Sequence, residues 1–285
     1  MNTVASRGVS AGMWITLWWL MICGWILLTV KLPGWVGRTT GWVAYCASWI
    51  ATHSRSEHWI WATAFVLLLA VNGTWLLSMA GQWRRARNWV RGLQFIDLPD
   101  PLRYLATECG VQERILYAAD RRLLSFTVGF VGPKVVLSEG FCELLNDEEL
   151  RAVLLHERIH VHGAHPLRLT WARAMAKALW FFPVIKELSR LYHMDLELEA
   201  DRSVIRQLGV NPLASALLKV METQIPGRDL TAHSVMGFDD CMPARIAQLK
   251  QREGDVRYHE WAFRPILQSG AFIVVYSAMV LLSCW

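Results

Sequence analysis

Long apolar runs divide this chain into membrane-like segments and one polar stretch. Residues 12–30 and 59–82 contain no charged residue and are rich in Trp, Leu and Ile, and residues 266–285 close the chain with a similar run. A helix needs about 20 predominantly apolar residues to cross the hydrocarbon core of a bilayer. The pattern therefore predicts an integral membrane protein with spans at about 12–31, 59–82 and 266–285.

The first 82 residues form the predicted N-terminal membrane region. A cleaved signal peptide is the alternative for the first run, but its apolar core is too long and no small-residue cleavage site follows before Lys31. Residues 33–58 are expected to form an outer loop, whose apolar part at 42–51 favours an interfacial helix because it is too short to span. If that part did cross, the N-terminus would change sides.

Orientation follows from the basic residues after the second run. Residues 83–91 contain four arginines, which marks this side as cytoplasmic under the positive-inside rule. The net charge of +5 is therefore attributed to topology and lipid headgroups. We expect no nucleic-acid partner, because no nucleic-acid-binding motif accompanies the charge. The six cysteines show no CxxC pairing, so no disulfide framework is expected.

Residues 83–265 are expected to form a cytoplasmic domain large enough to bury its own core. The pattern predicts a helix at 99–109 and strands at 115–117, 125–128 and 135–137, the last after the Gly132-Pro133 turn. The predicted class is a mainly α membrane protein, with an α+β domain that contains a small antiparallel sheet.

The residues most informative about chemistry are 156–160, which read His-Glu-Arg-Ile-His. On a helix, His156 and His160 lie on one face and can bind one metal ion, while Glu157 lies where it can accept a proton from water. Asn146 and Glu149 form a capping box that predicts the start of this helix. The five-residue pattern arises by chance in roughly 1% of chains of this length, so a third ligand is needed to establish a site.

Two positions compete for the third ligand. In one architecture a histidine lies six residues past the second, but Pro166 occupies that position here and His165 is one residue short. In the other, a glutamate comes from a second helix, and Glu197 and Asp201 lie one turn apart in the acidic segment 195–201. One of these carboxylates can bind the metal ion, and the other, Asp201 if Glu197 is the ligand, can accept a hydrogen bond from a ligand imidazole.

Residues 169–191 are apolar enough to suggest another span, but geometry opposes a single crossing. His160 and Glu197 must meet at one ion with bonds of about 2 Å, and one crossing between them would separate them. We therefore predict a membrane-associated or re-entrant segment that is broken near Pro183.

The combined motifs resemble the gluzincin-type membrane metallopeptidases, which include the HtpX quality-control proteases, the CAAX prenyl proteases and the BlaR/MecR antirepressor-like sensor proteases. The sensor branch is the more similar, over roughly residues 110–250. The segments that carry this resemblance are FTVGFVGPKVVL at 126–137, LWFFP at 179–183, the acidic segment at 195–201 and ARIAQL at 244–249.

The chain departs from that branch in three respects. Phe182 stands where the branch has Asn, and His165 stands where it usually has Asp, although a His there is similar to the HtpX-like branch. Because the chain ends with its last apolar run, we expect the extracellular β-lactam-binding sensor domain to be absent, and antibiotic sensing is not expected.

The resemblance implies a zinc-dependent endopeptidase in the bacterial inner membrane, with its active site facing the cytoplasm. It implies His156, His160 and Glu197 as zinc ligands and Glu157 as the general base. Arg245 is the candidate for oxyanion stabilisation, with His193 and Tyr192 as alternatives, and a structural ion pair is the competing role for Arg245. The 125–128 strand can pair its edge with an extended substrate.

Three functions remain open. The first is a regulatory protease that cleaves a transcriptional repressor or another membrane-associated regulator. The second is a quality-control protease that clears membrane proteins, and the third is a catalytically silent membrane sensor or scaffold. The intact Glu157 disfavours the third, because a structural zinc site needs no general base. The oligomeric state is not predicted.

Overall fold

The computed structural model describes residues 57–223, 238–250, 264–271 and 274. The predicted first span, the outer loop up to residue 56 and much of the predicted last span lie outside these residues. The elements in chain order are α3 (Glu57–Arg91), β1 (Phe95–Ile96), α4 (Asp100–Glu108), the 3-10 helix η1 (Gln112–Arg114), β2 (Ile115–Ala118), β3 (Ser125–Val128), β4 (Lys134–Ser138), α5 (Glu139–Leu144), α6 (Asp147–His162), α7 (His165–Ala178), α8 (Pro183–Leu208), α9 (Asn211–Thr223) and α11 (Phe238–Lys250). Residues 264–271 are also helical.

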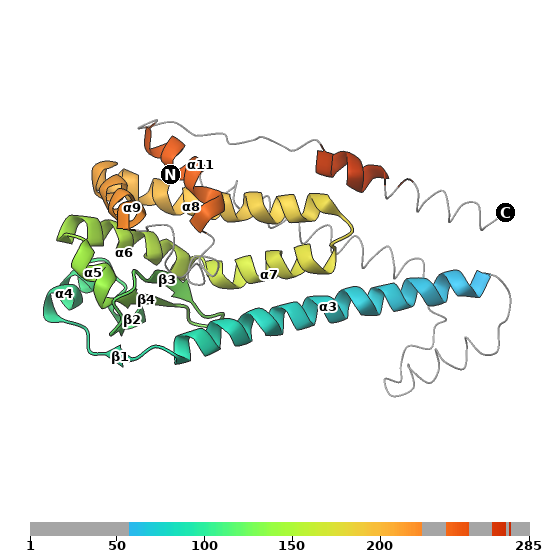
Figure 1. The fold of residues 1–285 in the computed structure, drawn as a ribbon, viewed down its shortest axis with the longest axis horizontal. Helices are drawn as coiled ribbons and strands as arrows, with labels where there is room; N and C mark the ends of the chain where they lie inside the picture. Colours follow the sequence, from blue (N-terminus) through green and yellow to red (C-terminus); the bar gives the residue numbers. More distant parts are fainter. Residues whose placement is uncertain (1–56, 224–237, 251–263, 272–273, 275–285) are drawn as a thin grey trace.

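Helix α3 is the longest element, and it runs along one side of the molecule (Figure 1). It extends beyond the predicted 59–82 segment and continues through the arginines to Arg91. Among the described helices, its Val66–Arg91 part is the one long and apolar enough to cross a membrane. Large apolar side chains along it are exposed, including Leu69 and Leu77. A lipid-facing helix presents such a surface.

The small sheet is mixed, which corrects the predicted antiparallel sheet. Its strand order is β1-β2-β4-β3, and β2 pairs with β4 in parallel, whereas β1 pairs with β2 and β3 with β4 antiparallel. The three strands expected from the sequence are present, and β1 was not predicted. Gly129 and Gly132 both have positive φ in the β3–β4 turn, which folds β4 back against β3 and brings it between β2 and β3. Strand β3 is therefore an edge of the described sheet.

Helices α7 and α8 form a hairpin that lies beside α3 (Figure 1). The chain leaves along α7, turns at residues 179–182 and returns along α8, which begins at Pro183. The predicted break near Pro183 is thus present. Trp180, in the turn, is 77% exposed. The hairpin brings Glu197 back towards α6 without a one-way crossing, and the entry of its turn into a bilayer stays a prediction.

Two apolar clusters hold these parts together. The larger one packs the sheet with α4, α6 and α9, around fully buried side chains such as Val135, Leu137 and Leu154. The other joins α3 to the hairpin, where the Trp75 and Trp171 rings meet edge to face with centroids 4.7 Å apart. The larger cluster also includes Val204 of α8, so burial fixes α6 and α8 relative to the sheet.

Candidate active site

Helix α6 begins where the sequence predicts. The Asn146 side chain accepts a hydrogen bond from the Glu149 backbone N–H, and the Glu149 carboxylate accepts one from the Asn146 N–H, both at 2.9 Å. Glu149 is buried and also receives hydrogen bonds from Ser215 and Lys219 of α9. The capping box therefore fixes the start of the helix and joins it to its neighbour. His156, Glu157 and His160 follow on the buried face.

The structure brings His156, His160 and Glu197 together. The two histidine Nε2 atoms are 3.0 Å apart, and the Glu197 carboxylate lies 3.4 Å from His156 Nε2 and 3.5 Å from His160 Nε2. Ligands of a tetrahedral zinc ion with bonds of about 2 Å lie about 3.3 Å from one another. The donor spacing therefore matches a tetrahedral site.

The far nitrogens of both imidazoles support the same interpretation. His156 Nδ1 lies 2.9 Å from Asp201 Oδ1, and His160 Nδ1 lies 2.8 Å from His165 Nδ1. If each Nδ1 carries the proton, both Nε2 lone pairs point at one another across 3.0 Å. A cation between them removes that repulsion, so the donor set fits a metal ion.

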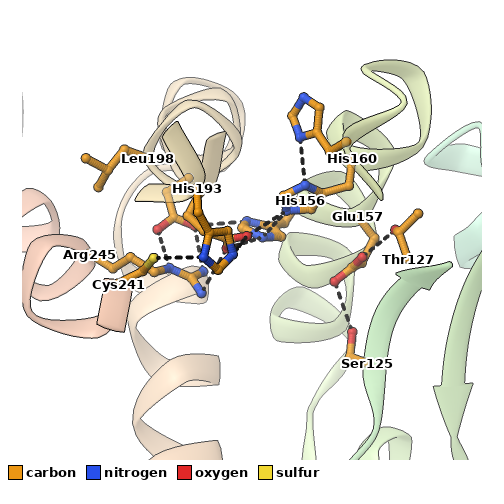
Figure 2. A network of polar contacts seen from close by, with 12 residues as sticks. Ser125, Thr127, His156, Glu157, His160, His193, Leu198, Cys241 and Arg245 are labelled. Carbon is orange, nitrogen blue, oxygen red and sulfur yellow. Dashed lines mark hydrogen bonds and ion pairs between the residues drawn. The ribbon is translucent and has the colours of Figure 1, made fainter. Parts of the chain in front are cut away.

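Asp201 is held in turn by Arg245. The Asp201 side chain is fully buried, and Arg245 donates two hydrogen bonds of 2.7 Å to it from Nε and Nη2. Arg245 Nη1 also lies 3.5 Å from Glu197. Figure 2 shows Arg245 beside His193 and Cys241, across the centre from His160. The contacts of Arg245 are those of the structural ion pair, and its role in oxyanion stabilisation remains a prediction.

His165, one residue short of the third-ligand position, is buried, and its Nδ1 lies 2.8 Å from His160 Nδ1. Ala164 has φ of 49°, a left-handed conformation that turns the chain sharply between α6 and α7. A Cβ on Gly163 would lie 2.2 Å from the His165 ring, so only glycine leaves room for this side chain. Burial lowers the pKa of His165 to about 3, which keeps its ring neutral and able to accept a hydrogen bond from the Nδ1–H of His160.

Glu157 points towards the sheet rather than towards α8 (Figure 2). Thr127 Oγ1 donates a hydrogen bond of 2.6 Å to Glu157 Oε2, and Ser125 Oγ donates one of 3.4 Å to Oε1. Burial raises the pKa of Glu157, while His156 and these hydroxyls oppose the shift. A raised pKa suits a group that must accept and release a proton near neutral pH. Sequence reasoning missed both hydroxyls, although their i, i+2 spacing on a strand places them on one face.

The pKa values of His156 and His160 shift in opposite directions. Burial lowers the pKa of His160 to about 4. Burial also acts to lower the pKa of His156, but hydrogen bonding to Asp201 and Glu197 outweighs it and raises that pKa to about 9. A bound metal ion would displace a proton from His156 Nε2.

A cavity of about 1070 Å³ opens onto the centre. It is lined by β3, by one face each of α3, α7 and α8, and by parts of α6, α9 and α11. His193 and Tyr192, the alternatives to Arg245 for oxyanion stabilisation, differ in their distance from the centre. His193 Nε2 is 3.7 Å from Glu197, whereas Tyr192 is buried beneath Arg168. His193 also lines the cavity, and Tyr192 is not among the residues that line it.

A helix-borne histidine pair, a glutamate from a second helix and a neighbouring buried glutamate are the arrangement that metallopeptidases use. The family model described as BlaR1 peptidase M56 matches residues 46–249, which include every element from α3 to α9 and nearly all of α11. The chain therefore belongs to the BlaR1 peptidase M56 family. Membership indicates a BlaR1-like metallopeptidase and agrees with a membrane protein, since the family consists of membrane proteins. No curated protein matches the chain.

Proposed function

We propose that the chain is a zinc-dependent metalloendopeptidase that hydrolyses peptide bonds of a regulatory protein at the cytoplasmic face of the bacterial inner membrane. The single observation that carries this proposal is the geometry of two opposed imidazoles and a carboxylate, with Glu157 beside them on the wall of a large cavity. His156, His160 and Glu197 would hold the zinc. A bound zinc ion supplies Lewis acidity, which lowers the pKa of water to about 7 and polarises a carbonyl.

The proton steps are assigned to Glu157. Its carboxylate accepts the proton of the attacking water and delivers it to the nitrogen of the leaving amine. The hydrogen bonds from Thr127 and Ser125 hold both carboxylate oxygens in place through this transfer. Because these hydroxyls come from β3, the general base is positioned by the same strand that borders the cavity.

The edge of β3 supports a binding mode for the substrate. Strand β3 pairs with β4 on one side and has no other strand beside it in the described sheet, and residues 125–130 line the cavity. An extended segment can add to this edge through main-chain hydrogen bonds, which depend little on its sequence. The peptide bond of such a segment would lie across α6 at Glu157.

The proposal is tested with the full chain in lipid nanodiscs, in wild-type form and as Glu157→Gln. We expect one zinc per chain in both proteins and casein hydrolysis by the wild type. Hydrolysis by the variant is expected to fall by about 10²-fold to 10⁴-fold because the general base is gone. Full activity in Glu157→Gln would overturn the mechanism.

The regulatory part of the proposal is tested by using Glu157→Gln as a substrate trap in cells. A single enriched transcription regulator is the expected result. Enrichment of many unrelated membrane proteins would favour quality control instead.

A further inference from the structure

Three cations from three different helices line the cavity in front of the metal centre. They are Arg85 of α3, Arg173 of α7 and Lys186 of α8. All three are exposed, and among the described residues none of them makes a hydrogen bond or ion pair. The other cations on the cavity wall differ, since Arg190 is paired with Glu187 and Arg245 with Asp201.

The carboxylates of the cavity do not compensate this charge. Among the described residues, Glu157 and Glu197 are the acidic side chains that line it. Glu157 is held by the β3 hydroxyls, and Glu197 faces the two histidines of the centre. The part of the cavity away from the centre is therefore cationic, and it attracts a ligand that carries a carboxylate.

Helical periodicity places these cations on the faces that lead to the centre. On α7 the cavity is lined by residues of one helical face, namely His165, Pro166, Leu169, Thr170, Arg173 and Ala176. Glu197 of the centre is among the charges that act on the Arg173 guanidinium, and both residues line the same cavity. The guanidinium group of arginine is always charged in proteins and can bind a carboxylate through two parallel hydrogen bonds.

We propose that Arg173, with Lys186 and Arg85, forms a subsite that binds an acidic side chain of the peptide substrate. This assignment rests on the proposed peptidase function. A peptide is favoured over a lipid headgroup because the same cavity is lined by the β3 edge and by Glu157, so that an extended chain bound there passes both the cations and the centre.

The helix geometry gives the position of that acidic residue. Arg173 is eight residues along α7 from His165, about 12 Å, and Lys186 is eleven residues before Glu197 on α8, about 16 Å. An extended peptide advances about 3.3 Å per residue. The acidic side chain therefore lies roughly three to five residues from the bond that is cleaved.

The test uses fluorogenic peptides with blocked termini, matched except for one Asp or Asn placed three, four or five residues to either side of the cleaved bond. The enzyme is the zinc-loaded full chain in nanodiscs. At one of these positions we expect the wild type to prefer Asp by about tenfold in kcat/KM, mainly through KM. Arg173→Gln is expected to reduce the Asp preference below about twofold, and Arg173→Glu is expected to reverse it, so that a Lys peptide is hydrolysed faster than the Asp peptide.

Lys177→Gln is the matched control, because Lys177 lies on the same helix, is exposed and does not line the cavity. It is expected to keep the wild-type preference. A peptide with a free C-terminus and no internal Asp tests whether the cations bind a terminal carboxylate instead. If this peptide is preferred over the Asn peptide as strongly as the Asp peptide is, the assignment to an acidic side chain is overturned.

Two further results would overturn the subsite. One is a ratio of Asp to Asn near one at every position in the wild type. The other is loss of binding to vesicles of phosphatidylglycerol in the Arg173, Lys186 and Arg85 variants with peptide preference intact, which would assign the cations to lipid. If the wild type hydrolyses no peptide at all, the peptidase proposal fails, yet fluorescence anisotropy with Glu157→Gln still measures whether the Asp peptide binds more tightly than the Asn peptide.

Discussion

The buried pair of Arg245 and Asp201 offers a test of how the proposed metal ligands are held. Both side chains are almost completely excluded from solvent, and two hydrogen bonds of 2.7 Å join them. Arg245→Gln leaves a buried carboxylate without its cation. Breaking a pair of this kind costs about 3–5 kcal/mol. For a domain of this size, that cost corresponds to a fall in Tm of about 10 °C.

The same variant separates positioning from catalysis. Asp201 lies 2.9 Å from His156 Nδ1, so its displacement disturbs a proposed metal ligand. We expect the zinc affinity of Arg245→Gln to fall by about 10-fold to 100-fold, while kcat at saturating zinc stays within about fivefold of the wild type. Thermal unfolding, competition with a fluorescent chelator and peptide hydrolysis measure the three quantities. Arg206→Gln is the control, because Arg206 is an exposed arginine on the same helix as Asp201.

One combination of results would refute this reasoning. If kcat fell by more than about 100-fold while Tm and zinc affinity stayed at wild-type values, Arg245 would act on the developing oxyanion. In that case its contacts with Asp201 would serve to aim the guanidinium at the substrate.

Three further predictions concern the same centre. His165→Ala removes the partner of His160 Nδ1, and zinc affinity measured by chelator competition is expected to fall about tenfold, with an unchanged affinity arguing against the contact. Thr127→Val removes the shorter hydrogen bond to Glu157; we expect kcat to fall about tenfold with zinc content unchanged, and an unaltered kcat would show that the base needs no such support. Removal of zinc with a chelator is expected to lower Tm, since zinc held at about 1,000 times its Kd adds about 4 kcal/mol of stability, and an equal Tm with and without zinc would contradict binding to the folded state.

Local sequence patterns predict much of the centre. The capping box at Asn146 and Glu149 predicts the start of α6, and the i, i+4 spacing of His156 and His160 gives their common face. Requiring His160 and Glu197 to meet excludes a single crossing between them, and the structure satisfies this with the α7–α8 hairpin. Each of these inferences depends on spacing along one helix or on chain continuity.

Features that depend on contacts between distant segments could not be predicted. The parallel pairing of β2 with β4 is a choice among strand partners of similar apolar content, which short runs of sequence do not determine. The sequence excludes His165 from the third-ligand position but does not predict its contact with His160, which depends on the left-handed turn at Ala164. The hydroxyls of Ser125 and Thr127 became meaningful only when β3 was placed beside α6.

The most direct test of the central claim is a zinc titration of the metal-free full chain, with peptide hydrolysis as the readout. The account predicts that turnover rises linearly and stops rising at one zinc per chain, and that Glu197→Ala shifts the titration to much weaker binding because one of three ligands is lost. Turnover in the metal-free protein equal to that of the loaded protein, or a Glu197→Ala titration identical to the wild type, would contradict the assignment of this centre.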